Sequence, residues 1–315
     1  MQGNQDRSML TGIVMILATV FAMALADAVV KSASNDMTLW QIYVLRSLLV
    51  TPVLLVLARR SIRVNGIGWV LLRSLTLTMM YLGIYAAIPL LDLSVIAASL
   101  YTGPLFIVAL SAIFLHEPIS ARHWIAILIG FLGVLLIVRP AASDFTPFAL
   151  IPVSAGLLYA VAAVITKAKC ASVPAYALAL WLNVTLLAFG IVASLLMGHA
   201  SLGAGIDCPF LFGTWGATDW PTIAVLAVLM LGISIGLARA YQSPKPQVIA
   251  TFDYAYLLFA GFWGFVFFGE IPDLDTVGGM ALIGLTGAFV FHADAGAGRR
   301  APARTLHTEI HADPN

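Results

Sequence analysis

Three ionisable side chains lie well inside long apolar stretches of this sequence, where a charge is costly. They are Asp27, Arg46 and Asp253. An ionisable group at membrane depth must face a partner or a water-filled cavity, because hydrocarbon does not solvate it. A carboxylate in such a cavity can hold an amino group or carry a proton, and a guanidinium can anchor a carboxylate. We therefore take these three residues as candidates for binding a small polar molecule.

Each of the three also has a structural alternative. Asp27 lies four positions before Lys31, a spacing that suits an ion pair along a helix. Arg46 could pair with Asp27 or with backbone carbonyl groups, and Asp253 could pair with Arg239 on the preceding stretch. The sequence alone leaves these alternatives open.

Five tyrosines complete the candidate binding site. They are Tyr81, Tyr85, Tyr101, Tyr159 and Tyr254. Tyr81 and Tyr85 are four positions apart and therefore share one face of a helix. A tyrosine buried in hydrocarbon needs a hydrogen-bond partner, so several converging hydroxyls predict a polar cavity. Each ring could instead anchor a helix at the membrane interface.

Membrane-spanning helices must position these side chains. The chain has 315 residues, of which 61% are hydrophobic and 10% charged, too apolar for a soluble domain. Apolar stretches of about 17 to 25 residues are long enough to cross a bilayer. Ten such stretches predict an all-α membrane protein with ten transmembrane helices, at about 9–31, 38–58, 68–90, 93–115, 122–138, 147–167, 174–197, 220–241, 247–268 and 274–291.

The sequence repeats itself once. Residues 98–117 (ASLYTGPLFIVALSAIFLHE) align without gaps on residues 251–270 (TFDYAYLLFAGFWGFVFFGE), with Tyr101 on Tyr254 and the final glutamates on each other. Because an odd number of spans separates equivalent positions, the copies should lie inverted in the bilayer. This predicts a first repeat over 1–140, a second over 141–294 and a disordered tail over 295–315.

The basic residues favour one orientation in the membrane. If the N-terminus is cytoplasmic, the opposite face holds only Lys31 and Arg139. The cytoplasmic face then holds Arg7, Arg59, Arg60, Arg63, Arg73, Arg122, Lys167, Lys169, Arg239, Lys245, Arg299, Arg300 and Arg304. The positive-inside rule therefore predicts a bacterial-type inner membrane protein with both termini cytoplasmic. The glycine-rich connection 198–219 would lie outside, as a lid or a plain loop.

The stretch from the fourth to the fifth span has a proline in the fourth span, a glutamate–proline turn and a glycine-rich fifth span that ends in a basic residue. These features lie at Pro104, Glu117, Pro118, Gly130, Gly133 and Arg139. In this pattern the stretch resembles the EamA-type domain of the drug/metabolite transporter superfamily. The second copy keeps Glu270 but has Leu257 where the first has Pro104. The resemblance implies two inverted five-helix repeats around a central site, in a secondary transporter that exports amino acids or related metabolites by alternating access.

Other functions fit less well. Efflux of hydrophobic or cationic drugs stays an alternative if the carboxylates face the cavity unpaired. A membrane-embedded sensor or enzyme without flux is another, although the sequence has no HExxH, GxSxG or P-loop motif. We expect no nucleic-acid partner, since the net charge is +1 and the basic residues belong to loops. We also expect no cofactor and no metal. The glycine-rich peripheral helices could also pair two copies of the chain.

Overall fold

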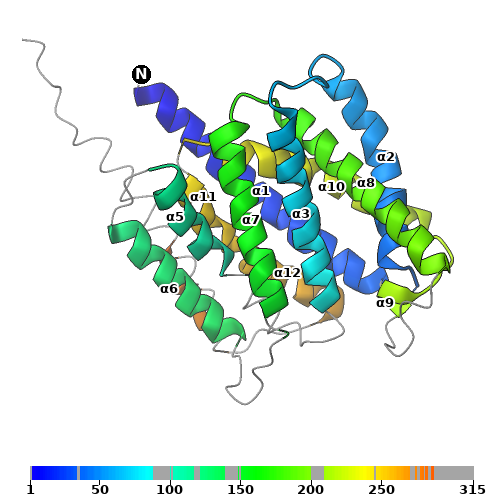
Figure 1. Ribbon diagram of the computed structural model, residues 1–315. Coiled ribbons are helices and arrows are strands. Elements are labelled where there is room, and N and C mark those ends of the chain that lie inside the picture. The colour runs from blue at the N-terminus through cyan, green and yellow to red at the C-terminus, as the bar shows by residue number, and fades with distance from the viewer. Residues whose placement is uncertain are drawn as a thin grey trace, which may run out of the picture.

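The computed structural model describes most of the chain up to the ninth expected span. The described residues are 2–33, 36–87, 100, 102–116, 121–138, 148, 150–199, 209–244, 246–269, 274, 277–279, 281–282 and 285–286. Within them the regular structure is helical, and the helices form one bundle (Figure 1). They are α1 (Gln2–Ala33), α2 (Leu39–Ala58), α3 (Ile67–Ala87), α5 (Gly103–Phe114), α6 (Ala121–Val138), α7 (Leu150–Lys169), α8 (Ala175–His199), α9 (Pro209–Phe212), α10 (Trp220–Tyr241), α11 (Pro246–Asp253) and α12 (Ala255–Phe268).

The described part of the chain contains 7 helices long and apolar enough to cross a membrane. They correspond to the first, second, third, sixth, seventh, eighth and ninth expected spans. The shorter apolar helices Gly103–Phe114 and Trp124–Gly133 lie in the fourth and fifth. Most of the tenth expected span, 274–291, lies outside the described residues. The structure therefore agrees with a multi-pass membrane protein, and the full set of ten inverted helices stays a prediction.

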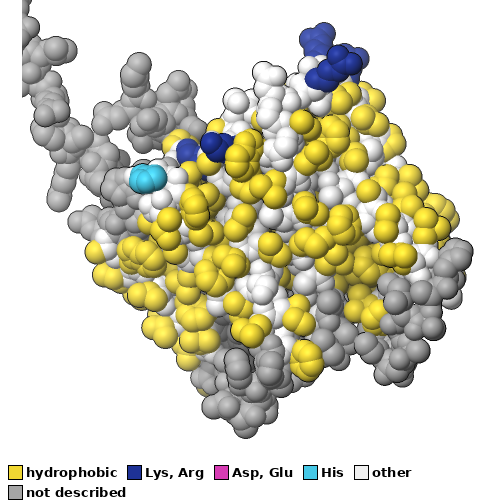
Figure 2. All heavy atoms as spheres, in the orientation of Figure 1, with side chains coloured by type: hydrophobic (Ala, Val, Ile, Leu, Met, Phe, Trp, Pro, Cys, Tyr) yellow, Lys and Arg dark blue, Asp and Glu magenta, His cyan; other side chains and the backbone are white. Residues whose placement is uncertain are grey.

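The outer surface of the bundle is apolar. Large side chains such as Val56, Phe114 and Val228 are 66%, 65% and 71% exposed. Figure 2 shows the same property as a broad band of hydrophobic side chains, with Lys and Arg gathered toward the upper edge. An apolar surface of this extent is stable only where lipid covers it, because exposing apolar side chains to water is unfavourable.

The two halves of the chain exchange packing partners. In the first half, α1 packs against α10 and α12 of the second half. In the second half, α7 packs against α3 and α5 of the first, and α2 and α8 pack against each other. The first helix of each half thus contacts the third and fourth helices of the other. This reciprocal packing is what two related five-helix units would produce.

The two ends of the bundle differ in the residues and helices that they carry. The basic end carries the exposed side chains of Arg59, Arg60, Arg63 and Lys169 at the α2–α3 and α7–α8 connections. The α9 end carries the end of α1, the beginnings of α2 and α10, and α9 itself. At this end α2 begins at Thr38, whose Oγ1 accepts a hydrogen bond from the Gln41 backbone N–H at 3.3 Å.

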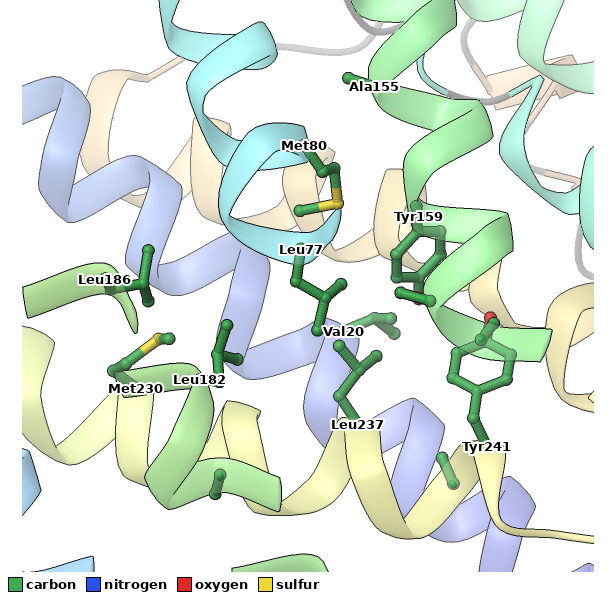
Figure 3. Packing of buried hydrophobic residues seen from close by; sticks show 14 of the residues in the cluster. Val20, Leu77, Met80, Ala155, Tyr159, Leu182, Leu186, Met230, Leu237 and Tyr241 are labelled. Carbon is green, nitrogen blue, oxygen red and sulfur yellow. The ribbon is translucent and has the colours of Figure 1, made fainter. Parts of the chain in front are cut away.

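Small residues let the helices approach closely. A methyl group on Gly236 of α10 would overlap Thr19 of α1, and one on Gly190 of α8 would lie 2.9 Å from Val44 of α2. Away from these contacts the interior is filled by apolar side chains from α1, α3, α7, α8 and α10, which converge in Figure 3. Van der Waals packing of this kind drives helix association in a bilayer, where the hydrophobic effect between helices is weak.

Candidate functional site

Asp27 marks a water-accessible space inside the bundle. Ile16 and Val20, on the same face of α1, are 0% exposed, so this face points inward. Asp27 follows Val20 by about two helical turns and lies on that face, yet its side chain is exposed. The accessible surface around this carboxylate therefore lies between the helices rather than on the lipid side.

The hydrogen-bond partner of Asp27 comes from the far end of the chain. Tyr256 of α12 donates its hydroxyl proton to Asp27 Oδ2 at 2.6 Å. Lys31 lies one turn beyond Asp27, with its Nζ 4.5 Å from the centre of the Phe268 ring. The Asp27 carboxylate is thus oriented by the neutral hydroxyl of Tyr256 on a distant helix. The spacing in the sequence had indicated Lys31 as its partner.

Arg46 faces the same region from α2. Its side chain is 7% exposed, and its guanidinium carbon lies 5.2 Å from the centre of the Tyr43 ring. Within the described residues the Arg46 Nε has no hydrogen-bond partner. Arg46 and Asp27 are close enough to interact electrostatically. A buried cation without a bonded anion can accept a carboxylate from a ligand.

Tyrosines line the space between these charges. The rings of Tyr43 and Tyr85 meet edge to face with centroids 6.0 Å apart. Tyr81 lies within electrostatic reach of both Asp27 and Arg46. We call this group the Asp27 site, and its members are Asp27, Tyr43, Arg46, Tyr81, Tyr85 and Tyr256. It combines one acid, one base and an aromatic wall, an arrangement suited to a small amphipathic molecule.

Asp253 belongs to a second group. Its side chain is 6% exposed, and Tyr241 of α10 donates its hydroxyl proton to Asp253 Oδ2 at 3.0 Å. Tyr159 of α7 packs edge to face on Tyr241 with centroids 5.8 Å apart. The two side chains lie next to each other in Figure 3. Arg239 is exposed on α10, and the described partner of Asp253 is a tyrosine instead. We call Asp253, Tyr241 and Tyr159 the Asp253 site.

The ninth span connects the two groups. It is divided at Tyr254, which separates α11 from α12. Asp253 ends α11 and belongs to one site, whereas Tyr256 in α12 belongs to the other. Tyr254 itself is 1% exposed, and its ring lies against α6, where a methyl group on Gly130 would be 3.0 Å away. Tyr254 therefore packs on a peripheral helix. Tyr101, also a candidate, lies outside the described residues.

A further buried charge, Arg73, was not expected. By its position in the sequence it belongs to the basic residues of the cytoplasmic face, yet its side chain is 1% exposed within α3. Its Nε donates to Thr166 Oγ1 at 2.7 Å, while its Nη1 has no partner among the described residues. Burial raises the pKa of the nearby Cys170 thiol, and the Arg73 guanidinium opposes that rise.

Three other members of the sites were also missed. Tyr43, Tyr241 and Tyr256 complete the hydrogen bonds and ring contacts described above. Tyr43 lies close to one turn before Arg46, and Tyr256 shares a span with Asp253, so proximity to the buried charges was the available signal. In the described part of the chain, no three His, Cys, Asp or Glu side chains are placed to hold a metal ion.

Comparison with known proteins gives one family and several relatives. The EamA-like transporter family matches residues 10–139. The pseudopaline exporter CntI of Pseudomonas aeruginosa (strain UCBPP-PA14) is 26% identical over 281 residues, which cover 87% of this chain and 93% of that protein. The riboflavin transporter of Vibrio cholerae serotype O1 is 26% identical over 300 residues, covering 92% and 96%. The S-adenosylmethionine uptake transporter of Rickettsia bellii is 25% identical over 197 residues, or 61% of each chain.

A solved crystal structure shares the fold. It aligns with a TM-score of 0.73 at 17% sequence identity, covering 93% of this chain and 99% of the other. The family and these named relatives are transporters rather than enzymes. The sequence matches, the apolar helices and the shared fold support membership of the drug/metabolite transporter superfamily, with an EamA-like domain matched over residues 10–139.

Proposed function

We propose that this protein is a secondary transporter that exports an amino acid or a related metabolite across the inner membrane. The observation that carries the proposal is the Asp27 site, in which an accessible carboxylate bonded to Tyr256 lies within electrostatic range of a buried guanidinium that packs on Tyr43. A zwitterion would place its amino group at Asp27 and its carboxylate at Arg46. Its side chain would lie on Tyr43 and Tyr85.

Asp27 is accessible, whereas the buried Arg46 would meet a ligand only after the helices move. Asp27 receives its hydrogen bond from Tyr256, a neutral group that an ammonium ion can displace or join. Arg46 lies over a ring and keeps donors that a carboxylate can bind in pairs. A polyanion would need more positive charge in this space than Arg46 supplies. The site thus favours a zwitterion over a nucleotide or a sugar phosphate.

The transport cycle would be alternating access by rocking of the two halves. The reciprocal packing of α1 on α10 and α12, and of α7 on α3 and α5, supports two related units that move against each other. Both termini would be cytoplasmic. Single cysteines placed beside Glu117 and beside Glu270 should then react with membrane-impermeant reagents from opposite sides. Labelling from the same side would overturn the inverted repeat.

Counterflow in proteoliposomes tests the substrate class. Vesicles loaded with unlabelled substrate should accumulate labelled substrate in a saturable way, and the panel would hold L-phenylalanine, L-methionine, S-adenosylmethionine and riboflavin. We expect amino acid counterflow that Asp27→Asn removes and that Asp36→Asn keeps. Asp36 is a suitable control because it is an exposed carboxylate at the same end of the bundle. Absence of counterflow across the panel would contradict the proposal.

Efflux of a hydrophobic cation is the second candidate. The accessible carboxylate of Asp27 beside the Tyr43 and Tyr85 rings favours it, because aromatic faces and a carboxylate are the groups that bind an organic cation. Labelled tetraphenylphosphonium in the same counterflow assay separates the two candidates. If it is carried and the zwitterions are not, Arg46 has no substrate role and the second candidate replaces the first.

A further inference from the structure

A short segment outside the spans packs over the α9 end of the Asp27 site. It comprises residues 209–218, which include α9 and the turn that follows it. Phe210 and Leu211 in this segment are 9% and 8% exposed, so their side chains are buried in the bundle end. The side chains of a plain connecting loop usually stay at the surface. In this segment the apolar side chains pack on a surface of the bundle instead.

The surface that receives the segment is the beginning of α2. Trp40 donates its indole N–H to the Leu211 carbonyl at 2.7 Å. The Gln41 side chain binds the next turn from both of its ends. Its Oε1 accepts from the Gly216 backbone N–H at 3.1 Å, and its Nε2 donates to the Gly216 carbonyl at 3.1 Å and to Thr218 Oγ1 at 2.9 Å.

This contact depends on the shape of both partners. Gln41 is 0% exposed, so its amide has no water to replace the hydrogen bonds that the segment supplies. Gly216 lies so close to the α1–α2 turn that a methyl group on it would be 2.6 Å from the Asp36 carbonyl oxygen. Only glycine fits at this position. We call the Gln41–Gly216 contact the latch.

Phe210 extends the aromatic wall of the Asp27 site. Its ring lies 6.0 Å from the ring of Tyr85, which in turn lies 6.0 Å from Tyr43, the residue beneath Arg46. The row of rings therefore runs without interruption from the external segment to the buried guanidinium. A ligand held between Asp27 and Arg46 would have Phe210 at the α9 end of this row of rings.

We propose that residues 209–218 form a lid over the Asp27 site, with Phe210 as a specificity-determining residue and the Gln41–Gly216 latch as the contact that holds the lid closed. The proposal rests on the proposed transport function for its substrate role, but not for the latch. Phe210 selects substrates by the size of the side chain that fits beneath it. Gln41 is a positioning residue, since it acts on the substrate through Phe210.

A labelling experiment tests the latch without any substrate. In detergent solution, with Cys170→Ala and Cys208→Ser, a Phe210→Cys variant should react slowly with a maleimide. Adding Gln41→Leu or Gly216→Ala should raise the rate of the maleimide reaction at least about tenfold, because each variant disrupts the latch that holds the lid closed. Trp220→Phe is the matched control, since this exposed tryptophan lies at the same end and should leave the rate unchanged. An unchanged rate in both latch variants overturns the lid.

A flux experiment then tests Phe210. With the amino acid substrate found in the counterflow panel, Phe210→Ala should raise KM about fivefold and Phe210→Tyr should restore it. Phe210→Trp should shift preference toward smaller side chains. If all three variants have the KM of the wild type, Phe210 does not contact the substrate. If the wild type carries nothing in the panel, the transport proposal fails, and the labelling experiment still decides the lid.

Discussion

The two carboxylates inside the bundle have the same kind of partner and opposite access to water. Asp27 accepts a hydrogen bond from Tyr256 at 2.6 Å, and Asp253 accepts one from Tyr241 at 3.0 Å. Asp27 is nevertheless exposed on an inward face, whereas Asp253 is 6% exposed. Arg46 lies within electrostatic reach of Asp27. The described groups that act on Asp253 are the tyrosines Tyr159 and Tyr241.

This difference separates two roles that the same residue type can play. A group that binds substrate must be reached by it, and the exposed Asp27 meets this requirement once the lid is open. Asp253 is enclosed by Tyr241 and Tyr159, so a ligand reaches it only after the helices move. We therefore expect Asp27 to act in binding and Asp253 to act in the conformational step that follows. The kinetic parameters KM and kcat distinguish these roles.

The largest expected effect is that of Asp27→Asn. The amide cannot neutralise the amino group of a zwitterion, so kcat/KM in counterflow should fall about a hundredfold, mainly through KM. The measurement is initial counterflow rate against substrate concentration, with protein amount held equal. Asp36→Asn serves as the control. A rise in KM of less than about twofold would mean that Asp27 is structural. The assignment of substrate binding to Asp27 and of the conformational step to Asp253 would then be wrong.

Asp253→Asn should have a smaller effect of a different kind. The amide oxygen still accepts the Tyr241 hydrogen bond, so the amount of folded protein and its Tm should not change. Net transport should fall about tenfold through kcat, because the buried group changes environment only when the helices move. Normal flux would end the functional role of Asp253. A change confined to KM would instead assign both carboxylates to substrate binding.

The spans and the buried charges could be predicted because both follow from the cost of polarity in hydrocarbon. Hydropathy located the seven long helices that the structure describes. The same cost singled out Asp27, Arg46 and Asp253. Hydropathy does not give the rotation of each helix about its axis, as Arg73 illustrates. It lies near a span end, where a loop charge and a buried charge have the same sequence context, yet it is 1% exposed.

The division into two sites could not be predicted, because the partners come from other helices. Asp27 and its donor Tyr256 are 229 positions apart, and only the packing of α1 on α12 brings them together. The segment 209–218 is a similar case. Its glycines suggest a loop, and nothing in the sequence indicates that Gln41 binds Gly216. Conversely, the glycine-rich α6 uses Gly130 for contact with Tyr254 of the same chain, so pairing of two copies stays a prediction.

Tyr256→Phe tests how the Asp27 carboxylate is oriented. Removing one hydroxyl leaves the charge in place and deletes its hydrogen bond, which is worth about 1 kcal/mol, so KM should rise about fivefold. Tyr241→Phe is the matched variant at the other carboxylate, and it should leave KM unchanged while lowering kcat. If both variants change the same parameter by the same factor, the two carboxylates act as one site rather than two.

The smallest expected effect is that of Lys31→Met, and it decides which neighbour orients Asp27. The ammonium of Lys31 lies over the Phe268 ring, while the bond to Asp27 comes from Tyr256. Loss of an exposed cation–π contact costs about 0.5 to 1 kcal/mol of stability, and counterflow should stay within about twofold of the wild type. If Lys31→Met instead reproduces the defect of Asp27→Asn, the helical ion pair is the functional unit, and Asp27 would be charge-paired in a way that Asp253 is not.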